Sequence, residues 1–211
     1  MVEASKFYDA LSRGSVEEVK EITRKALSAG DSPEKILKEG LIKAMDQVGV
    51  KFKNSEIYIP EVLIAARAMH AGLGILKPIL AKSSGVTTAK VALGTVKGDL
   101  HDIGKNLVGM MLEGAGFEVV DLGIDVSAEK FVQSAQEKGA QVIGMSALLT
   151  TTMMQMKTTV EMVKKAGFQG VKTIVGGAPV TAEFAKQIGA DGYAPDAATA
   201  VSIVKGILGV K

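Results

Sequence analysis

The second half of the chain alternates short β-branched runs with stretches of helical period, and this alternation constrains the fold more than any other feature. The five apolar runs are VALGTV (91–96), FEVVDLG (117–123), QVIGMS (141–146), KTIVGG (172–177) and, more weakly, DGYAP (191–195). Strands alternating with helices in this way predict a parallel, doubly wound sheet with right-handed crossovers. We therefore expect an α/β domain with a five-stranded sheet over residues 87–211.

The first half of the chain has helical period throughout. Its apolar residues fall on helical stripes, such as Val16, Val19, Ile22 and Leu27. Breaks at 14–15, 30–33 and 53–56 divide it into four segments, and Pro33 and Pro60 fit the first turn of a helix. We expect a four-helix bundle over residues 1–86, followed by a linker of small and polar residues at 82–88.

Composition excludes several kinds of chemistry. The chain has no cysteine, which rules out disulfides, thiolate metal sites and thiol nucleophiles. Its 25 basic and 23 acidic residues are interspersed and leave a net charge of +2, so we expect no nucleic acid as a partner. No uninterrupted apolar run approaches the ~20 residues needed to cross a bilayer. We therefore expect no membrane association and a cytoplasmic protein.

Three loops are expected to meet at one edge of the sheet. They are GDLHDIG (98–104), SALLTTT (146–152) and GGAPVT (176–181), each directly after a strand. The carboxyl ends of parallel strands share an edge, where open α/β sheets bind ligands. His101 is one of only two histidines in the chain and lies there with Asp99 two residues before it. It could coordinate a metal carried in from outside, with Asp99 on its other ring nitrogen.

Each of these elements also has an ordinary explanation when taken alone. Asp102 is then a helix N-cap, Asp99 a turn residue and His101 a solvated loop histidine. Ser146 is a small residue ending a buried strand, the glycines at 176 and 177 form a plain turn, and the threonines at 150–152 form a cap region.

The spacing of the loops carries more information than any one of them. Gly104 is followed by 41 residues, then Ser146-Ala147-Leu148, then 27 residues, then Gly176-Gly177. This arrangement closely resembles the signature of the cobalamin-binding domain family, Asp-x-His-x-x-Gly, Ser-x-Leu and Gly-Gly, over residues from about 90 to 211. The resemblance implies a Rossmann-like, flavodoxin-like domain that binds cobalamin or a related corrinoid.

The resemblance also implies roles for individual residues. The lower nucleotide tail of the corrinoid leaves the cobalt and enters a slot beside the sheet, and His101 replaces it as the lower axial ligand. Ser146 contacts the buried base, while Gly176 and Gly177 line the slot. The remaining expected corrinoid contacts, on the same loops, are Gly98, Asp99, Asp102, Ile103, Gly104, Leu148 and Thr150.

Methionine synthase, which has a similar loop, carries a hydroxyl residue six positions after the motif serine. Thr152 stands at that position here, where the relative has serine. The resemblance therefore implies a hydrogen-bonded chain of Asp99, His101 and Thr152 that passes a proton as the cobalt changes its need for a lower ligand.

The helical half narrows the function. Residues 45–69 resemble the helical cap of methionine synthase and of corrinoid proteins that serve substrate-specific methyltransferases. Phe52 and Ile59 match the apolar residues that shield the methyl group on the upper face of the cobalt, and Val62 adds to them. Without the downstream motif, these three would be ordinary bundle residues.

The resemblance implies a corrinoid methyl carrier that is not catalytic alone. Its expected partners are a substrate-specific methyltransferase, a second methyltransferase acting on tetrahydrofolate, coenzyme M or a similar acceptor, and a reductive activase. A cobalamin storage or sensing module and the small subunit of an adenosylcobalamin mutase are the alternatives. The 86 residues before the domain count against the mutase.

Overall fold

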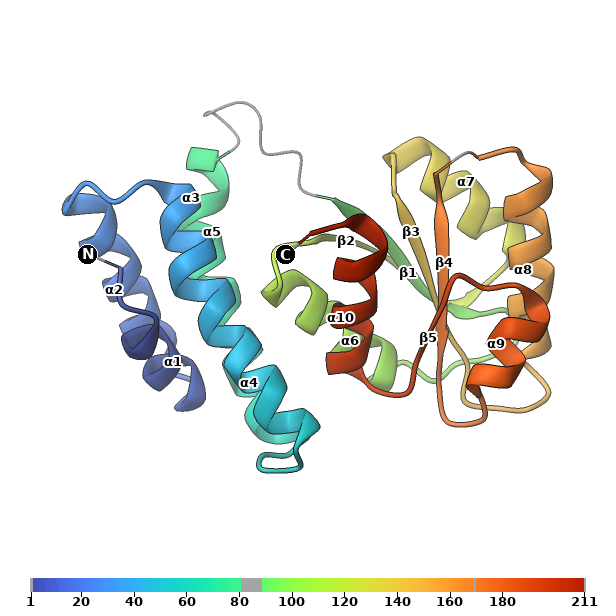
Figure 1. Cartoon of the computed structure of the whole chain (residues 1–211), viewed down its shortest axis with the longest axis horizontal. Helices are drawn as coiled ribbons and strands as arrows, with labels where there is room; N and C mark the ends of the chain where they lie inside the picture. Colours follow the sequence, from blue (N-terminus) through green and yellow to red (C-terminus); the bar gives the residue numbers. More distant parts are fainter. Residues whose placement is uncertain (1, 81–88, 169, 211) are drawn as a thin grey trace. The chain divides into compact units, whose positions relative to one another are not determined.

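The computed structural model describes residues 2–80, 89–168 and 170–210 (Figure 1). It divides into two compact units, Met1–Thr88 with Glu113–Gly116, and Ala89–Leu112 with Phe117–Lys211. The linker expected at 82–88, and with it the expected boundary between residues 86 and 87, lies outside the described residues.

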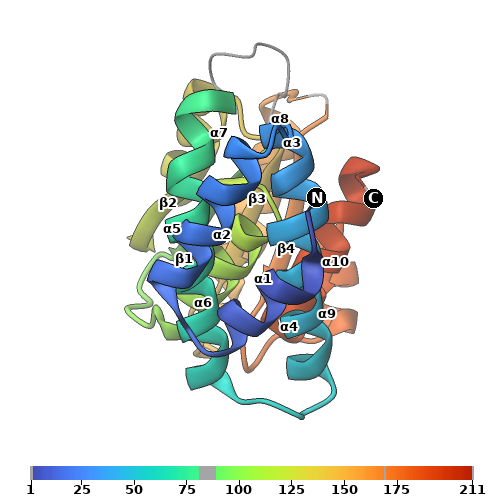
Figure 2. The same cartoon turned by 90° about the vertical axis from the view of Figure 1, so that its left-hand side faces the viewer.

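The first unit is helical. Its elements are α1 (Ala4–Ser12), α2 (Val16–Ser28), α3 (Pro33–Lys35), the π-helical segment η1 (Ile36–Ile42), α4 (Lys43–Lys53) and α5 (Ile59–Leu80). Helix α2 packs against α5, and α1 packs against α4 and α5 (Figure 2). The largest fully buried side chains of this unit are Phe7, Leu11, Val19, Ile36, Leu41, Val48, Met69 and Leu76.

The third helical segment differs from a regular α-helix. It runs without a break from Pro33 to Lys53, and residues 36–42 within it form the wider π-helix. Gly40 lies in this segment against Phe7, and a Cβ on Gly40 would come within 2.7 Å of a Phe7 ring carbon. The absence of a side chain at Gly40 therefore lets the helix approach the phenyl ring.

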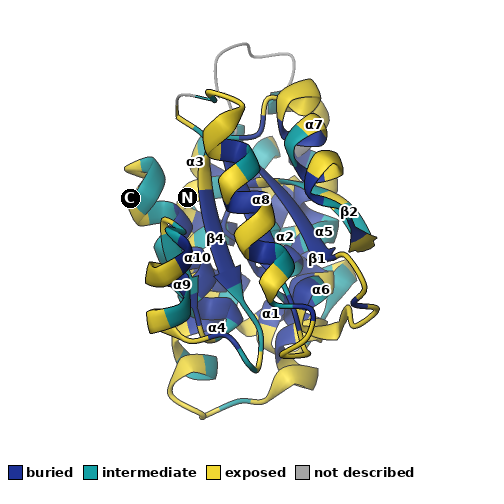
Figure 3. Ribbon diagram, turned by 90° about the vertical axis from the view of Figure 1, so that its right-hand side faces the viewer, coloured by how far each residue is buried: buried dark blue, intermediate teal, exposed yellow. Residues whose placement is uncertain are grey.

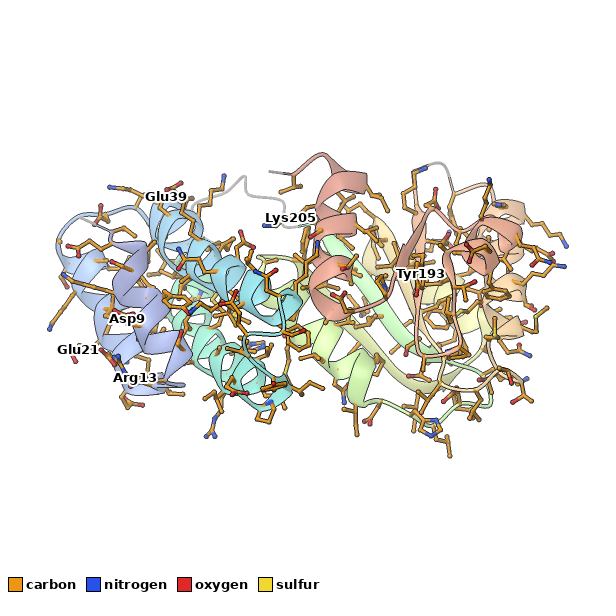
Figure 4. All side chains as sticks on the ribbon, turned by 60° about the horizontal axis from the view of Figure 1, so that its bottom comes forward. Asp9, Arg13, Glu21, Glu39, Tyr193 and Lys205 are labelled. Atoms are coloured by element: carbon orange, nitrogen blue, oxygen red, sulfur yellow. The ribbon has the colours of Figure 1, made fainter. Side chains whose placement is uncertain are left out.

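Helix α5 is long and apolar enough, by length and composition alone, to cross a membrane. Glu61 and Arg67 interrupt its apolar sequence. Its buried hydrophobic residues are Val62, Ala65, Ala66, Ala68, Met69, Leu73 and Leu76. These residues place α5 as the central helix of the bundle. Charged side chains such as Arg13, Glu21 and Glu39 extend from the surface of the same unit (Figure 4).

The second unit contains a five-stranded sheet in the order β2-β1-β3-β4-β5, with every pair of neighbours parallel. The strands are β1 (Lys90–Val96), β2 (Glu118–Val126), β3 (Val142–Ser146), β4 (Lys172–Gly176) and β5 (Gly192–Ala194). The intervening helices are α6 (Ile103–Gly114), α7 (Ala128–Lys138), α8 (Met154–Lys165), α9 (Ala182–Ile188) and α10 (Ala197–Leu208). The predicted fold class, a helical bundle followed by a Rossmann-like parallel sheet, is confirmed.

Helices cover both faces of this sheet. Helices α7, α8 and α9 share one core with the strands, built around Phe131, Ile143, Met156 and Val160, while α6 and α10 lie on the opposite face (Figure 1). Strands β1 and β4 are largely buried between these layers (Figure 3). The register aligns Thr95 with Ser146, and Ser146 with Gly176, so the loops that follow β1, β3 and β4 start side by side.

Candidate functional site

The loop after β1, here called the histidine loop (residues 98–104), is built around the buried carboxylate of Asp99. Asp99 is 0% exposed. Its Oδ1 accepts a hydrogen bond from the backbone N–H of His101 at 3.1 Å and lies 2.7 Å from Nδ1 of the same residue. Its Oδ2 accepts hydrogen bonds from the N–H groups of Leu148 at 2.8 Å and Leu149 at 3.3 Å, and from Thr152 Oγ1 at 2.6 Å. One carboxylate thus joins the loop after β1 to the loop after β3.

These hydrogen bonds keep Asp99 ionised. Burial alone would raise its pKa, but the hydrogen bonds from Thr152, Leu148 and His101 outweigh burial and hold the pKa far below its usual range. An ionised carboxylate carries no proton, so Nδ1 of His101 is the donor in the contact between them.

The hydrogen bond to Asp99 therefore orients the His101 ring and occupies its Nδ1. Its side chain is 51% exposed, while its partner Asp99 is inaccessible. Because Nδ1 carries the proton, Nε2 of the neutral ring has a free lone pair, the form in which histidine binds a metal. The structure thus brings Asp99, His101 and Thr152 together in the hydrogen-bonded chain that the sequence analysis expected.

The rest of the histidine loop is open to solvent. Asp102 precedes the first residue of α6, and its side chain accepts a hydrogen bond from the Asn106 side chain at 3.0 Å. Ile103 is 76% exposed, an unusual position for a large apolar residue. A Cβ on Gly104 would meet no atom within 4 Å. No packing within the described protein therefore requires glycine at 104.

Several large apolar side chains are exposed on the histidine loop and at the same edge of the sheet. Leu100 is 68% exposed and follows β1, and Leu148 and Leu149, 44% and 42% exposed, follow β3. Ile124, near the end of β2, is 43% exposed. Together with Ile103 they offer an apolar surface of the kind that an extended ligand covers. The sequence analysis missed Leu100, Leu149 and Ile124, although an isoleucine or leucine in a polar loop after a strand is the signal that could have found them.

The other motif residues lie along the same edge. Ser146 ends β3 and is half-buried, and its hydroxyl forms no hydrogen bond among the described residues. Thr150 is exposed in the loop that follows. Gly98 has a φ of 82° and donates its N–H to Asp125 Oδ1 at 2.7 Å.

Gly176 and Gly177 have reasons for being glycine within the protein itself. A Cβ on Gly177 would lie 1.9 Å from the Ala147 carbonyl oxygen, and one on Gly176 would lie 2.6 Å from that of Ala194. Gly177 also has a φ of 127°. Gly177 lets the loops after β3 and β4 pass close together, and Gly176 lets β4 lie close to the end of β5.

The expected cap residues lie in the helical unit around the loop between α4 and α5. Phe52 is half-buried, and Ile59, the first residue of α5, is 43% exposed. Val62 is fully buried inside the bundle.

The sequence analysis also missed residues that brace the histidine loop. Thr95, on β1, is 0% exposed and donates its hydroxyl to the His101 carbonyl oxygen at 2.8 Å. The Lys105 side chain is 2% exposed, and its Nζ lies 2.7 Å from Asp121 Oδ1 on β2. The sequence signal for Lys105 is its place directly after the motif, in GDLHDIGK. The structure then shows it buried, and a buried lysine almost always has a partner.

The donor set indicates which kind of metal fits. Within residues 2–80, 89–168 and 170–210, no three His, Asp or Glu side chains lie close enough to hold a metal ion together. A single imidazole with a carboxylate behind it, on a loop that also exposes apolar side chains, fits a metal that arrives inside its own macrocycle.

Comparison with known proteins agrees with this geometry. Residues 89–202 match a family model described as B12 binding domain, and residues 3–77 match a second model with the same description. A corrinoid protein of Desulfitobacterium hafniense (strain Y51) is 44% identical over 204 residues, 95% of this chain and 94% of that protein. Trimethylamine corrinoid protein 1 of Methanosarcina mazei is 43% identical over 207 residues, 97% of this chain and 96% of that protein.

Two solved structures are also similar. A cobalamin-binding protein from Desulfitobacterium hafniense DCB-2 superposes with a TM-score of 0.81 at 32% identity, covering 97% of this chain and 98% of that one. A chain of the methanol:cobalamin methyltransferase complex from Methanosarcina barkeri superposes with a TM-score of 0.83 at 31% identity, covering 98% of this chain and 79% of that one.

The fold and the matched domain define a cobalamin-binding protein whose cofactor is a corrinoid. Within that class, the chain belongs to the corrinoid protein family.

Proposed function

We propose that this protein carries a methyl group between two methyltransferases on the cobalt of its corrinoid, with His101 as the lower axial ligand. The observation that carries the proposal is the ring of His101, whose Nδ1 is held by Asp99 at 2.7 Å while the other ring nitrogen is left for coordination. The bound corrinoid supplies a cobalt that accepts and releases the methyl group. The protein supplies the ligand, its orientation and the surrounding surface.

The relatives indicate where to look for the methyl donor. Several of those at 42–44% identity are named trimethylamine or dimethylamine corrinoid proteins, and a solved structural relative belongs to a methanol methyltransferase complex. We therefore propose a methylated amine as the first donor class to test, and methanol as the second. Partner methyltransferases and a reductive activase in the cytoplasm complete the proposal.

Individual side chains have distinct proposed roles. The open space at Gly104 and the exposed apolar side chains of Ile103 and Leu148 would receive the macrocycle. The free hydroxyl of Ser146 would meet the displaced base of the nucleotide tail, with Thr150, Gly176 and Gly177 further along that edge. Gly98 and Asp102 would shape the turn that presents His101. In the helical unit, Phe52 and Ile59 would form the cap over the upper face, and the buried Val62 would support the helix that carries Ile59.

The hydrogen-bonded chain has a proposed role in proton transfer. Thr152 Oγ1 lies 2.6 Å from Asp99 Oδ2 and 3.0 Å from the Leu149 carbonyl oxygen, so its single proton can be given to either. We propose that this choice adjusts the strength of the hydrogen bond between Asp99 and Nδ1 of His101. The change Thr152→Val should shift the pH at which the imidazole leaves the cobalt, whereas Thr152→Ser should not. An unchanged pH profile in the valine variant would contradict the relay.

The ligand is tested by electron paramagnetic resonance of the Co(II) corrinoid bound to protein labelled with ¹⁵N-histidine. A protein ligand splits each cobalt line into a doublet, whereas a ¹⁴N base of the cofactor splits it into a triplet. We expect the doublet in the unmodified protein and its loss in His101→Ala. A triplet in the unmodified protein would show that the cofactor keeps its own base.

A storage or sensing module is the competing function. The carrier is distinguished by loading the protein with a ¹⁴C-methyl group and mixing it with purified methyltransferases encoded near its gene. Transfer of label to an acceptor supports the carrier. Retention of label with every such partner would leave storage or sensing as the function.

A further inference from the structure

The backbone of the histidine loop is held by side chains that lie outside the cobalamin-binding signature. Asp99 fixes the ring and the N–H of His101, but it does not reach the carbonyl group of that residue. Thr95 Oγ1 donates to this carbonyl oxygen at 2.8 Å. Each polar group of His101 except the ring nitrogen available for coordination therefore has a protein partner.

Thr95 is suited to set the height of the loop above the sheet. It is the residue before last of β1, is 0% exposed and stands in register with Ser146 of β3. Its backbone is thus fixed by a central strand. Its hydroxyl bonds the carbonyl oxygen of a residue six positions later in the sequence, so the backbone of His101 is linked directly to the strand.

Asp125 holds the other end of the same loop from β2. Its Oδ1 accepts a hydrogen bond from the Gly98 N–H at 2.7 Å, and its own N–H donates to the Asp99 carbonyl oxygen at 3.1 Å. Asp125 has a φ of 54°, a left-handed conformation that aspartate and asparagine tolerate better than most residues. This backbone conformation accompanies both hydrogen bonds to the histidine loop.

We propose that Thr95 and Asp125 are positioning residues that hold His101 at the distance and angle needed for coordination to the corrinoid cobalt. This inference rests on the proposed function, in which His101 is the ligand. Neither residue touches the cofactor in this account. Thr95 acts through the His101 carbonyl and Asp125 through the turn at residues 98–99.

The experiment on Thr95 compares two variants. Thr95→Val keeps the shape of the side chain and removes the hydroxyl, while Thr95→Ser keeps the hydroxyl. With ¹⁵N-histidine labelling and saturating Co(II) cobalamin, we expect the valine variant to lose most of the protein nitrogen doublet and about tenfold in corrinoid affinity, as is typical when the support of a ligand is removed. The serine variant should retain both.

Asp125 is exposed, so its substitution does not disturb the protein core. Asp125→Gly accepts the left-handed φ and removes the acceptor, whereas Asp125→Asn accepts the φ and keeps an acceptor oxygen. We expect a weakened doublet in the glycine variant and a full doublet in the asparagine variant. Thermal unfolding of all four variants is measured in parallel, because a residue of purely structural importance would lower stability without changing the doublet at saturation.

The outcomes separate this inference from the proposed function. A full doublet in both Thr95→Val and Asp125→Gly overturns it, and a full doublet in one of them overturns it for that residue. If the unmodified protein gives no doublet, the proposed ligand is wrong. A doublet that His101→Ala removes and the positioning variants keep leaves the ligand in place and rejects only the positioning roles.

Discussion

Asp99 shows how much of the site depends on one residue. Its two carboxylate oxygens contact His101 on one side and Leu148, Leu149 and Thr152 on the other. Without this acceptor, the part-buried N–H groups of Leu148 and Leu149 would lose their hydrogen-bond partner, at a cost of about 1–3 kcal/mol each. The carboxylate is therefore needed both for the local fold and for the orientation of the histidine.

The glycines of the site give the first prediction. Gly104→Ala should leave the free energy of unfolding unchanged or slightly higher, because a Cβ there meets nothing and alanine favours helix. It should lower corrinoid affinity about tenfold or more by filling space meant for the cofactor. Urea unfolding and cobalamin titration measure the two effects. Unchanged affinity would show that the macrocycle does not approach residue 104.

Gly177→Ala should behave in the opposite way, losing about 3 kcal/mol or more of stability. Its Cβ would collide with the Ala147 carbonyl oxygen, and its φ of 127° is unfavourable for alanine. Gly30→Ala is the matched control, since Gly30 has a φ of 85° but open space around it. If both variants lost the same stability, the close approach of the loops would not matter.

For single residues, the sequence predicted which residues belong to the site better than it predicted why each is needed there. The resemblance to methionine synthase implied a cluster of Asp99, His101 and Thr152, and the structure brings these three residues together. Gly176 and Gly177 were expected to line a slot, but their contacts to backbone carbonyls could not be foreseen, because such contacts depend on how neighbouring strands and loops pack in three dimensions.

Among the helices, the π-helical segment gives the next prediction. Gly40→Ala should destabilise the helical unit by about 1–3 kcal/mol, because the new Cβ would press on the Phe7 ring. Gly74→Ala, on α5 in open space, should be neutral or stabilising. Thermal unfolding followed by circular dichroism compares the two. Equal effects would mean that Gly40 is not in contact with Phe7.

Strands β4 and β5 provide a prediction about pH. Burial raises the pKa of Asp191, but hydrogen bonds from the Thr173 N–H, Lys172 and the Thr173 hydroxyl lower it below its usual range overall. A lowered pKa in the folded state means that the ionised form adds stability at neutral pH, which is lost as the pH falls below about 4.

The change Asp191→Asn should therefore cost about 1–2 kcal/mol at pH ~7 and progressively less on acidification. Urea unfolding at several pH values measures the difference from the unmodified protein. A difference that does not change with pH would mean that the charge of Asp191 does not contribute.

Helices and strands followed from periodicity, whereas irregularities within them did not. The apolar runs located all of the described strands, but β2 continues to Val126, past the predicted end at residue 123. Its register against β1 shifts between Leu93 and Gly94 and again before Val96. The π-helical segment was equally invisible, since it changes the helix diameter without changing which residues are apolar.

For the whole molecule, ligand binding gives the last prediction. Cobalamin at about 100 times its Kd should raise the free energy of unfolding of the α/β unit by about 2.7 kcal/mol, because only the folded state presents the site. Urea unfolding with and without cobalamin measures the gain. His101→Ala should show a smaller gain at the same concentration. Equal gains in both would mean that the histidine adds nothing to binding.

The absence of a metal-binding cluster among the described residues has a consequence for metal selectivity in the cell. Free zinc and copper ions compete for sites that offer several donors, and affinity then follows the intrinsic preference of each ion. A single imidazole beside exposed apolar side chains offers such ions only one donor atom, so they bind weakly. With His101 as the proposed ligand, the protein would recognise the corrinoid ring and leave the choice of metal to the enzymes that insert cobalt into that ring.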